Sequence, residues 1–214
     1  MFAEHLFISL IWKTPKEWAA LALDQFDEFL LDHASAERKA NASCLMIATR
    51  YPDRRDVIEL GLAMAAEELQ HFREVVALLH DRGRRFEASR PDPYIDGLLG
   101  QLRNDRELWL LDRLLMSTII EARGCERFGL LGDAMALDGR FAKAESPEPF
   151  RSEQSRSLAD YYRELSRTEA RHYGTYIRLA KAHFPTEVVE TRLREMIARE
   201  GEVLASLPLR PSLH

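Results

Sequence analysis

Two short stretches with the same spacing, Glu68-Leu69-Gln70-His71 and Glu169-Ala170-Arg171-His172, decide how this chain can fold. In each stretch a glutamate precedes a histidine by three residues, inside a segment with helical periodicity. Residues three apart share one face of an α-helix, so each stretch directs a carboxylate and an imidazole the same way. These two donor groups suit iron, manganese or zinc. Two copies in one chain predict the two halves of one metal site.

Hydrophobic residues recur at helical spacing through most of the chain. This periodicity predicts five helices, over residues 16–50, 54–80, 104–131, 152–183 and 186–206. Residues 84–103 contain prolines and glycines and are too many for a tight turn, so they predict a long crossover connection. No segment alternates as a strand does. The predicted fold class is all-α, with one domain over residues 1–214 that forms a four-helix bundle with an extra C-terminal helix.

Local signals predict where several of these helices begin and end. Thr14 and Thr186 are expected to cap the first and fifth helices, and Asp53 the second. Gly83 is expected to end the second helix in a left-handed conformation. The tail from Pro208 carries no such signal, and we expect it to be loose.

The positions of the breaks between the helices predict that four glutamates lie at the same level along the bundle axis. Glu37 and Glu68 are equally far from the break at residues 52–53, so they are level in an antiparallel helix pair. Glu121 and Glu169 are likewise equally far from the centre of the second break. The chain thus repeats a helix with Glu followed by a helix with Glu-x-x-His. Both pairs can therefore contribute to one layer of the bundle.

This layer contains six predicted metal ligands: Glu37, Glu68, His71, Glu121, Glu169 and His172. An ionised carboxylate without a partner is very costly inside a protein. Two divalent cations would neutralise the four carboxylates, with both histidines as neutral ligands. One Glu from each of two helices and Glu-x-x-His from two others is the ligand set of four-helix carboxylate di-metal sites. The alternative, that all four glutamates face solvent, requires each to lie in an apolar seam by accident.

Composition limits the function only broadly. The net charge of −5 does not indicate a nucleic-acid binder, so a polyanionic partner would need a local basic patch. The two cysteines, Cys44 and Cys125, form neither a disulfide framework nor a Cys-x-x-Cys site, which fits a reducing cytoplasm. The apolar stretch 6–12 lacks the features of a signal peptide, and no run is long enough to span a membrane. We therefore expect a cytoplasmic protein without membrane association.

Several strings of residues resemble the family of tRNA hydroxylases that act on 2-methylthio-isopentenyl-adenosine, within the ferritin-like di-iron superfamily. They are Lys13-Thr14-Pro15 with Trp18, Leu30-Leu31-Asp32-His33-Ala34 with Glu37 and Lys39, Glu67-Glu68-Leu69-Gln70-His71-Phe72, Asp112-Arg113-Leu114-Leu115, Ile120-Glu121-Ala122-Arg123-Gly124-Cys125-Glu126-Arg127-Phe128 and Glu169-Ala170-Arg171-His172-Tyr173. Together they span most of the chain. The two strings that begin at Glu121 and Glu169 are the most family-specific.

The resemblance implies a ferritin-like bundle with two iron ions at the six predicted ligand positions, all of which have the expected residue types. It further implies a monooxygenase that hydroxylates the isopentenyl group of the modified adenosine next to the anticodon in tRNA. Dioxygen would be the co-substrate, and a reductase or ferredoxin system would supply electrons. The substrate base lies in a single-stranded loop, from which it can be splayed outward.

Basic residues near two helix ends are candidates for contacts with tRNA. The candidates are Arg82, Arg84 and Arg85 at the end of the second helix, and Lys13 and Lys16 at the start of the first. In an antiparallel pair both groups lie near one end of the bundle, where they could bind phosphates. The alternative is that they are ordinary solvated charges at helix ends.

Three residues beside the predicted ligands have two interpretations each. Cys125, one turn after Glu121, is either a substrate-pocket residue or a small core residue. His33, one turn before Glu37, is either a partner of that ligand or a core histidine, and we favour the latter. Glu67 either orients a histidine across the bundle or faces solvent.

Other functions remain open from the residues alone. They are a rubrerythrin-like peroxidase, a manganese catalase, an iron-storage ferroxidase, and a non-enzymatic helical interaction protein with a structural metal site. A rubredoxin module would need Cys-x-x-Cys pairs, which the chain lacks. Storage sites usually lack the second histidine, whereas this chain has both His71 and His172. The ligand types by themselves do not separate iron from manganese.

Overall fold

The computed structural model describes residues 8–87, 91–141, 144–145 and 157–213. Within these ranges the chain forms helices and no β-strand, which confirms the predicted all-α class. The helices are α1 (Lys16–Asp24), α2 (Phe26–Arg50), α3 (Arg55–Asp81), α4 (Pro93–Leu99), α5 (Arg106–Leu137), α6 (Leu158–His183) and α7 (Thr186–Ser206). No described helix is long and apolar enough to cross a membrane.

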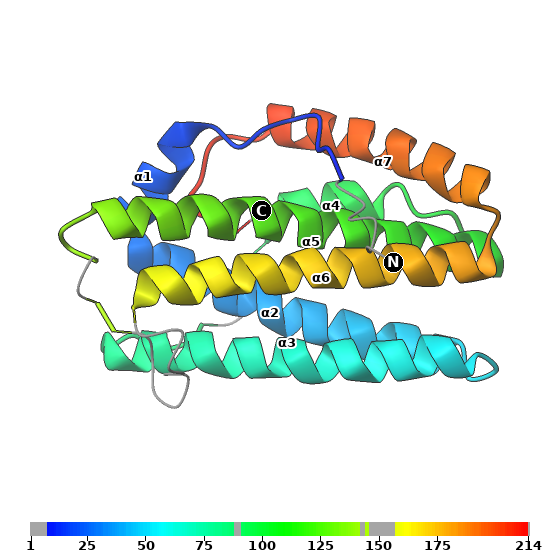
Figure 1. Ribbon diagram of the computed structural model, residues 1–214, viewed down its shortest axis with the longest axis horizontal. Helices are drawn as coiled ribbons and strands as arrows, with labels where there is room; N and C mark the ends of the chain where they lie inside the picture. Colours follow the sequence, from blue (N-terminus) through cyan, green and yellow to red (C-terminus); the bar gives the residue numbers. More distant parts are fainter. Residues whose placement is uncertain (1–7, 88–90, 142–143, 146–156, 214) are drawn as a thin grey trace, which may run out of the picture.

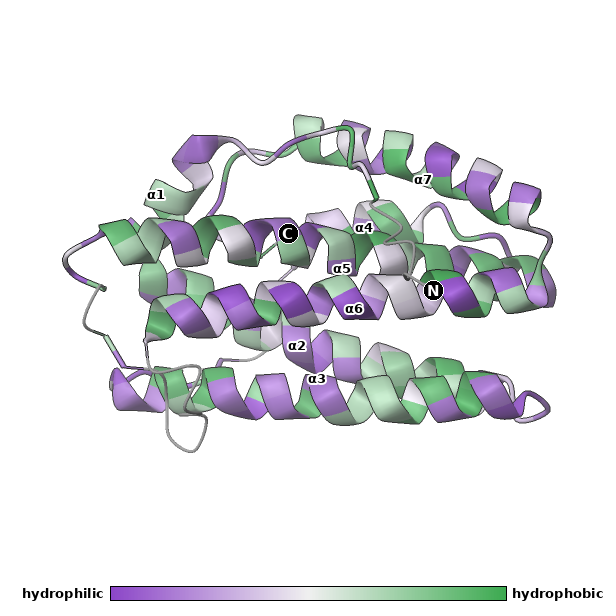
Figure 2. Cartoon of the chain, viewed as in Figure 1, coloured by the Kyte–Doolittle hydropathy of each residue, from purple (hydrophilic) through white to green (hydrophobic). Residues whose placement is uncertain are grey.

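Two helical hairpins form the four-helix bundle. Helix α2 pairs with α3, and α5 pairs with α6, as the sequence predicted (Figure 1). The long connection between α3 and α5 carries the short helix α4, which packs against α7. Helices α1 and α7 both lie against α5 on the outside of the bundle. Hydrophobic and hydrophilic residues alternate along each long helix, as amphipathic helices require (Figure 2).

The hydrophobic core consists of two clusters, one in each half of the bundle. One cluster includes Phe29 of α2 and Tyr162 of α6, and the other includes Leu114 of α5 and Tyr176 of α6. Along α2, α3 and α6 the predicted metal ligands come between the residues of the two clusters, and on α5 Glu121 lies near the boundary, one residue before Ala122 of the one cluster and seven before Phe128 of the other. The core therefore leaves a polar layer at the middle of the bundle.

The start of the first helix differs from the expectation. A break at Gln25 (φ −115°, ψ 45°) divides the predicted helix into α1 and α2. Pro15, not Thr14, occupies the N-cap position, because the Thr14 hydroxyl donates to Glu126 Oε2 of α5 at 2.6 Å. The Thr14 side chain thus binds a residue of α5 instead of capping the helix that follows it in sequence.

Two more predicted caps are wrong, and one helix end is confirmed. Asp53 forms an ion pair with Arg106 of α5, and α3 begins after Arg54 without a side-chain cap. Thr186 is the first residue of α7 and Pro185 its N-cap. Gly83 has the expected positive φ of 68°, which glycine adopts without a steric cost.

The helices on either side of the second break also end differently from the prediction. Helix α5 continues through Gly132 to Leu137. A Cβ atom at Gly132 would lie 2.9 Å from the Ala159 carbonyl oxygen, so this glycine permits close packing of α5 on α6. Helix α6 begins at Leu158, where the Ser157 hydroxyl accepts from Asp160 N, and residues 152–156 of its predicted start lie outside the described residues.

The C-terminal tail is packed, contrary to the expectation that it would be loose. The Ser212 carbonyl accepts hydrogen bonds from Trp18 Nε1 and Arg127 Nη1, both at 3.0 Å. Leu213 N donates to Asp32 Oδ2 at 2.7 Å. Ser212 and Leu213 are buried. The tail therefore joins α1, α2 and α5.

A buried ion pair joins α5 to α7. Arg123 is fully buried, and its Nε and Nη2 atoms donate to the Glu200 carboxylate at 2.9 and 3.0 Å. Its Nη2 atom also donates to the Trp12 carbonyl at 2.9 Å, and Nη1 pairs with Glu126. The guanidinium thus holds α7 and the N-terminal segment against the bundle.

We expect Glu200→Leu to destabilise the fold by about 3 kcal/mol, because it leaves the Arg123 cation buried without its main partner. The double variant Arg123→Met with Glu200→Leu should lose less, since it removes both charges. Urea unfolding measures both values. Arg199→Gln, which alters an exposed neighbour, is the control. A double variant less stable than Glu200→Leu alone would contradict this explanation.

Candidate metal centre

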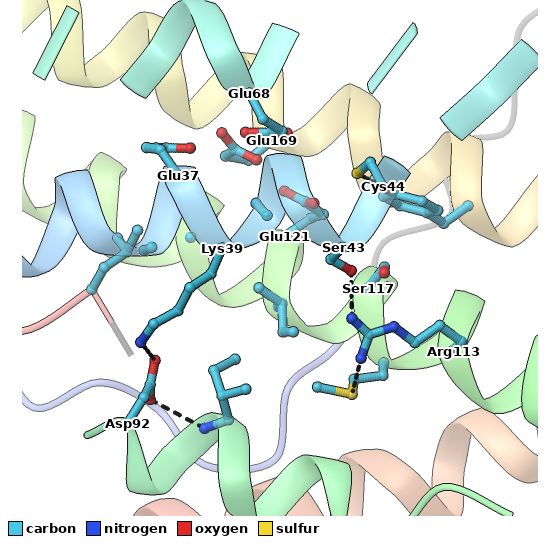
Figure 3. Close-up of a pocket in the computed structure, with 18 of the residues that line it drawn as sticks. Glu37, Lys39, Ser43, Cys44, Glu68, Asp92, Arg113, Ser117, Glu121 and Glu169 are labelled. Atoms are coloured by element: carbon cyan, nitrogen blue, oxygen red, sulfur yellow. Dashed lines mark hydrogen bonds and ion pairs between the residues drawn. The ribbon is translucent and has the colours of Figure 1, made fainter. Parts of the chain in front are cut away.

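The four long helices bring the six predicted ligands together in the polar layer. All six side chains are buried. They are Glu37 from α2, Glu68 and His71 from α3, Glu121 from α5, and Glu169 and His172 from α6. Figure 3 shows the four glutamates gathered at one end of a cavity. The level arrangement that the sequence predicted is therefore the arrangement in the structure.

The donor atoms form two adjacent groups that share one glutamate. In the first group, single donor atoms of Glu68, Glu121, Glu169 and His172 lie within 4.8 Å of one another. In the second, the same holds for Glu37, His71 and Glu169. Glu169 belongs to both groups, so the two groups are adjacent.

The histidines turn the same ring nitrogen toward the carboxylates. His172 Nδ1 lies 3.2 Å from Glu68 Oε1 and 3.4 Å from Glu169 Oε2. His71 Nδ1 lies 3.4 Å from Glu68 Oε2 and 3.9 Å from Glu37 Oε2. Each helix thus supplies its donors from one face, as the three-residue spacing requires.

Three donor atoms of this layer have no hydrogen-bond partner. They are Nδ1 of His71, Nδ1 of His172 and Oε1 of Glu68, and all three are buried. Buried polar atoms without a partner are rare because they lose their hydration without compensation. Metal ions placed between the donors would use these lone pairs. The residues therefore fit a di-metal centre.

Burial and mutual repulsion keep protons on the cluster. Burial first, and then the neighbouring carboxylates, raise the pKa of Glu37 and of Glu169 well above the usual value. Burial acts to raise the pKa of Glu68 as well, but the two histidines outweigh it and lower that pKa. Burial acts to lower the pKa of His172, but three carboxylates raise it. Metal ions would have to displace these protons.

Two further residues contact the predicted ligands. Glu67 Oε2 lies 3.0 Å from His172 Nε2, so this half-exposed carboxylate spans from α3 to α6 and orients the imidazole ring. His33 Nε2 lies 2.7 Å from Glu37 Oε1. His33 is fully buried beside Phe29 and Phe128, so it is both a core residue and a partner of a predicted ligand.

A cavity of about 190 Å³ reaches the carboxylates from the side of α2, α4 and α5. Its walls are mainly apolar, with Met116, Ile120 and Phe128 of α5 among the lining residues. Away from the glutamates it is flanked by two cations that the sequence analysis had not assigned to a site, Lys39 and Arg113 (Figure 3).

The remaining lining residues of the cavity come from segments that the sequence did not predict to be close together. The Asp92 carboxylate pairs with Lys39 at 3.0 Å and accepts from Ile95 N at the start of α4. The Asp92-Pro93 step is a helix-start signal that could have indicated α4. Cys125 does not line the cavity, because its sulfur faces Ser166 of α6 at 3.6 Å. Cys44 lines it instead.

The basic residues proposed for tRNA contacts lie apart from this cavity. Arg82 Nε donates to Asp27 Oδ1 at 2.5 Å, and Arg84 Nη2 lies 3.8 Å from Glu28 Oε1. Arg85 is exposed, as are Lys13 and Lys16. Helix α1 and the end of α3 lie at the same end of the bundle, as expected (Figure 1). None of these five basic residues lines the cavity.

The fold and the six-residue layer together define the ferritin-like class of carboxylate di-metal proteins. A solved structure with this fold is Protein 43 with aldehyde deformylating oxygenase activity from Synechococcus. It matches with a TM-score of 0.80 and 32% identity, over 96% of this chain and 93% of that one.

The chain belongs to the tRNA-(MS[2]IO[6]A)-hydroxylase (MiaE) family, whose model matches residues 4–214. Two similar relatives bear the name tRNA 2-(methylsulfanyl)-N(6)-isopentenyladenosine(37) hydroxylase. The protein from Pseudomonas putida is 31% identical over 90% of this chain and 85% of its own length. The protein from Salmonella typhimurium is 30% identical over 94% of this chain and 64% of its own length.

We expect metal binding to release protons and to strengthen as pH rises, because Glu37 and Glu169 must lose their protons to become ligands. In the metal-free protein their raised pKa makes the fold less stable as pH rises above the value of an unfolded glutamate. The difference in melting temperature between Fe(II)-loaded and metal-free protein should therefore grow from pH 5.5 to 7.5. A difference that is constant or that shrinks over this range would contradict the buried site.

Proposed function

We propose that this protein is an oxygen-dependent tRNA hydroxylase. Its substrate would be the isopentenyl group of 2-methylthio-isopentenyl-adenosine beside the anticodon, and it would act in the cytoplasm. The observation that carries the proposal is a buried layer of carboxylates and imidazoles in which three donor atoms make no hydrogen bond, and which opens into an apolar cavity. Membership of the hydroxylase family and the names of both relatives support the same activity.

The six residues of the layer would hold two iron ions. When bound, the iron would supply the activation of dioxygen, with electrons from an external reductase or ferredoxin. The histidines would act as neutral ligands through Nδ1, and Glu67 would fix the ring of His172 by accepting from its Nε2–H. His33 would in turn hold Glu37 in place.

The cavity would hold the isopentenyl group next to the carboxylate layer. Its apolar walls favour a branched hydrocarbon chain and exclude water from the reacting carbon. Holding the chain in one orientation selects the carbon that is hydroxylated. Because the substrate base lies in a loop, it can leave the stack of neighbouring bases and enter the protein.

We expect tRNA incubated with the protein, Fe(II), a reductant and ¹⁸O₂ to yield a modified nucleoside that is heavier by one ¹⁸O atom. Mass spectrometry of the digested tRNA measures this product. His172→Ala should abolish it, since it removes a predicted ligand, whereas Arg178→Met, on the exposed face of α6, should not. Loss of peroxide without a labelled nucleoside would favour the peroxidase or catalase alternative. Iron uptake alone would favour storage.

We further expect the exposed basic residues at one end of the bundle to contact tRNA phosphates. A variant with Arg82, Arg84 and Arg85 changed to Ala should bind tRNA more weakly and with a shallower dependence of affinity on salt concentration. Its iron content should stay the same. Filter binding at several salt concentrations measures both quantities. If affinity and salt dependence match the parent protein, the phosphates contact another surface.

A further inference from the structure

Arg113 occupies an unusual position in the cavity. It lies on α5 two helical turns before Glu121, which corresponds to roughly 12 Å along the helix axis. Only 8% of the residue is exposed to solvent, and it lines the same cavity as the glutamates. Figure 3 shows Arg113 and Ser43 on one side of the cavity, opposite the ion pair of Lys39 and Asp92.

The guanidinium of Arg113 lacks a carboxylate partner. Its Nη2 atom donates to Ser43 Oγ and its Nη1 atom contacts Met116 Sδ at 3.4 Å, while Nε is buried without a hydrogen bond. No carboxylate among the described residues lies within 4.0 Å of it. Burial lowers the pKa of Arg113, which reflects the same lack of a counter-charge.

Arg113 differs from the two other buried arginines among the described residues. Arg127 has no carboxylate partner either, but its Nη1 atom donates to the Ser212 carbonyl at 3.0 Å and its Nε atom to the Thr14 hydroxyl at 3.3 Å. Arg123 has Glu200, and the buried Asp112 carboxylate next to Arg113 in sequence is shared by Arg103 and Arg192. A buried cation without a counter-charge costs stability. Proteins retain such costs mainly at functional sites. The unused donors of Arg113 therefore indicate a ligand that accepts hydrogen bonds inside the cavity.

The shape of the cavity limits what that ligand can be. With about 190 Å³ the cavity is smaller than the roughly 300–1,000 Å³ of a typical ligand pocket, so it cannot enclose a whole nucleotide. A phosphate would also have to lose its hydration shell to reach a residue as buried as Arg113. A prenylated purine matches better, because its apolar chain is at one end and its ring nitrogens, which are neutral acceptors, are at the other.

We propose that Arg113 is a specificity-determining residue that donates hydrogen bonds to ring nitrogens of the modified adenine while the isopentenyl group faces the glutamates. This inference rests on the proposed function. A guanidinium N–H group can donate to a ring nitrogen of adenine such as N7, which is a hydrogen-bond acceptor. Ser43 and Met116 hold the fork in place before the base enters. The residue would thus distinguish a prenylated purine from an apolar chain of similar size.

Two small probes test this assignment without any catalytic turnover. The first is the free nucleoside 2-methylthio-N6-isopentenyladenosine, which has ring nitrogens and no phosphate. The second is N-isopentenylaniline, which has the same chain on a ring without nitrogens. Equilibrium dialysis should show that Arg113→Met weakens nucleoside binding about 10-fold to 100-fold and leaves aniline binding unchanged. Arg113→Lys should lie between. Arg178→Met, which removes an exposed charge outside the cavity, should match the parent protein.

A stability measurement separates this role from a structural one. Because the Arg113 cation is unpaired, Arg113→Met should melt at the same temperature as the parent protein or higher. A lower melting temperature together with equal loss of both probes would show that the residue only supports the cavity, and would overturn the inference.

Two other outcomes are also decisive. If the parent protein binds the nucleoside no more tightly than Arg113→Met does, the inference fails, even where the parent hydroxylates tRNA. If Arg113→Met weakens tRNA binding while nucleoside binding is unchanged, the guanidinium holds a phosphate and the assignment to the base is wrong. Absence of any hydroxylated tRNA with the parent protein would instead contradict the proposed function.

Discussion

The burial of four carboxylates and two imidazoles at the centre of the bundle is the constraint on which the rest of the structure depends. These groups lie between two hydrophobic clusters, where their charges have little water to stabilise them. Protons retained by glutamates such as Glu37 reduce the repulsion between the carboxylates. They do not give every buried atom of the layer a hydrogen bond, because three of these atoms still lack one. Packing elsewhere in the bundle must therefore offset the cost of this layer. The pairing of α2 with α3 and of α5 with α6 supplies most of that packing.

Peripheral elements hold this frame together through polar contacts that are themselves buried. The string from Glu121 to Phe128 illustrates the division of tasks along a single helix. Glu121 faces the polar layer, whereas Arg123 and Arg127 face the other way and bind α7, the N-terminal segment and the C-terminal tail. A string that resembles a catalytic motif is thus largely a structural one. Through these contacts Arg123 and Arg127 help to fix the position of α5, and with it that of Glu121, along the bundle axis.

The cavity combines elements that are remote in sequence, and each contributes a different property. Helices α2 and α5 supply the apolar walls and the glutamates, α4 covers the side away from them, and Leu213 of the tail adds to the lining. The two cations beside the cavity differ in their surroundings, because Lys39 has Asp92 and Arg113 has no carboxylate. The Arg113 guanidinium is therefore a charged group without a counter-charge in a cavity whose walls are mainly apolar. Such a space favours a ligand with one polar and one apolar end.

The sequence by itself determined the helical class, the pairing of the long helices and the meeting of Glu37, Glu68, His71, Glu121, Glu169 and His172. Helical periodicity and equal distances from the chain breaks depend only on local geometry, so they survive in the folded protein. Tertiary structure decided the rest: Thr14 bonds to Glu126 rather than capping a helix, the C-terminal tail packs, and Arg113 lines the cavity without a carboxylate partner. These outcomes depend on which distant residues compete for the same hydrogen bonds, and a local pattern contains no information about such partners.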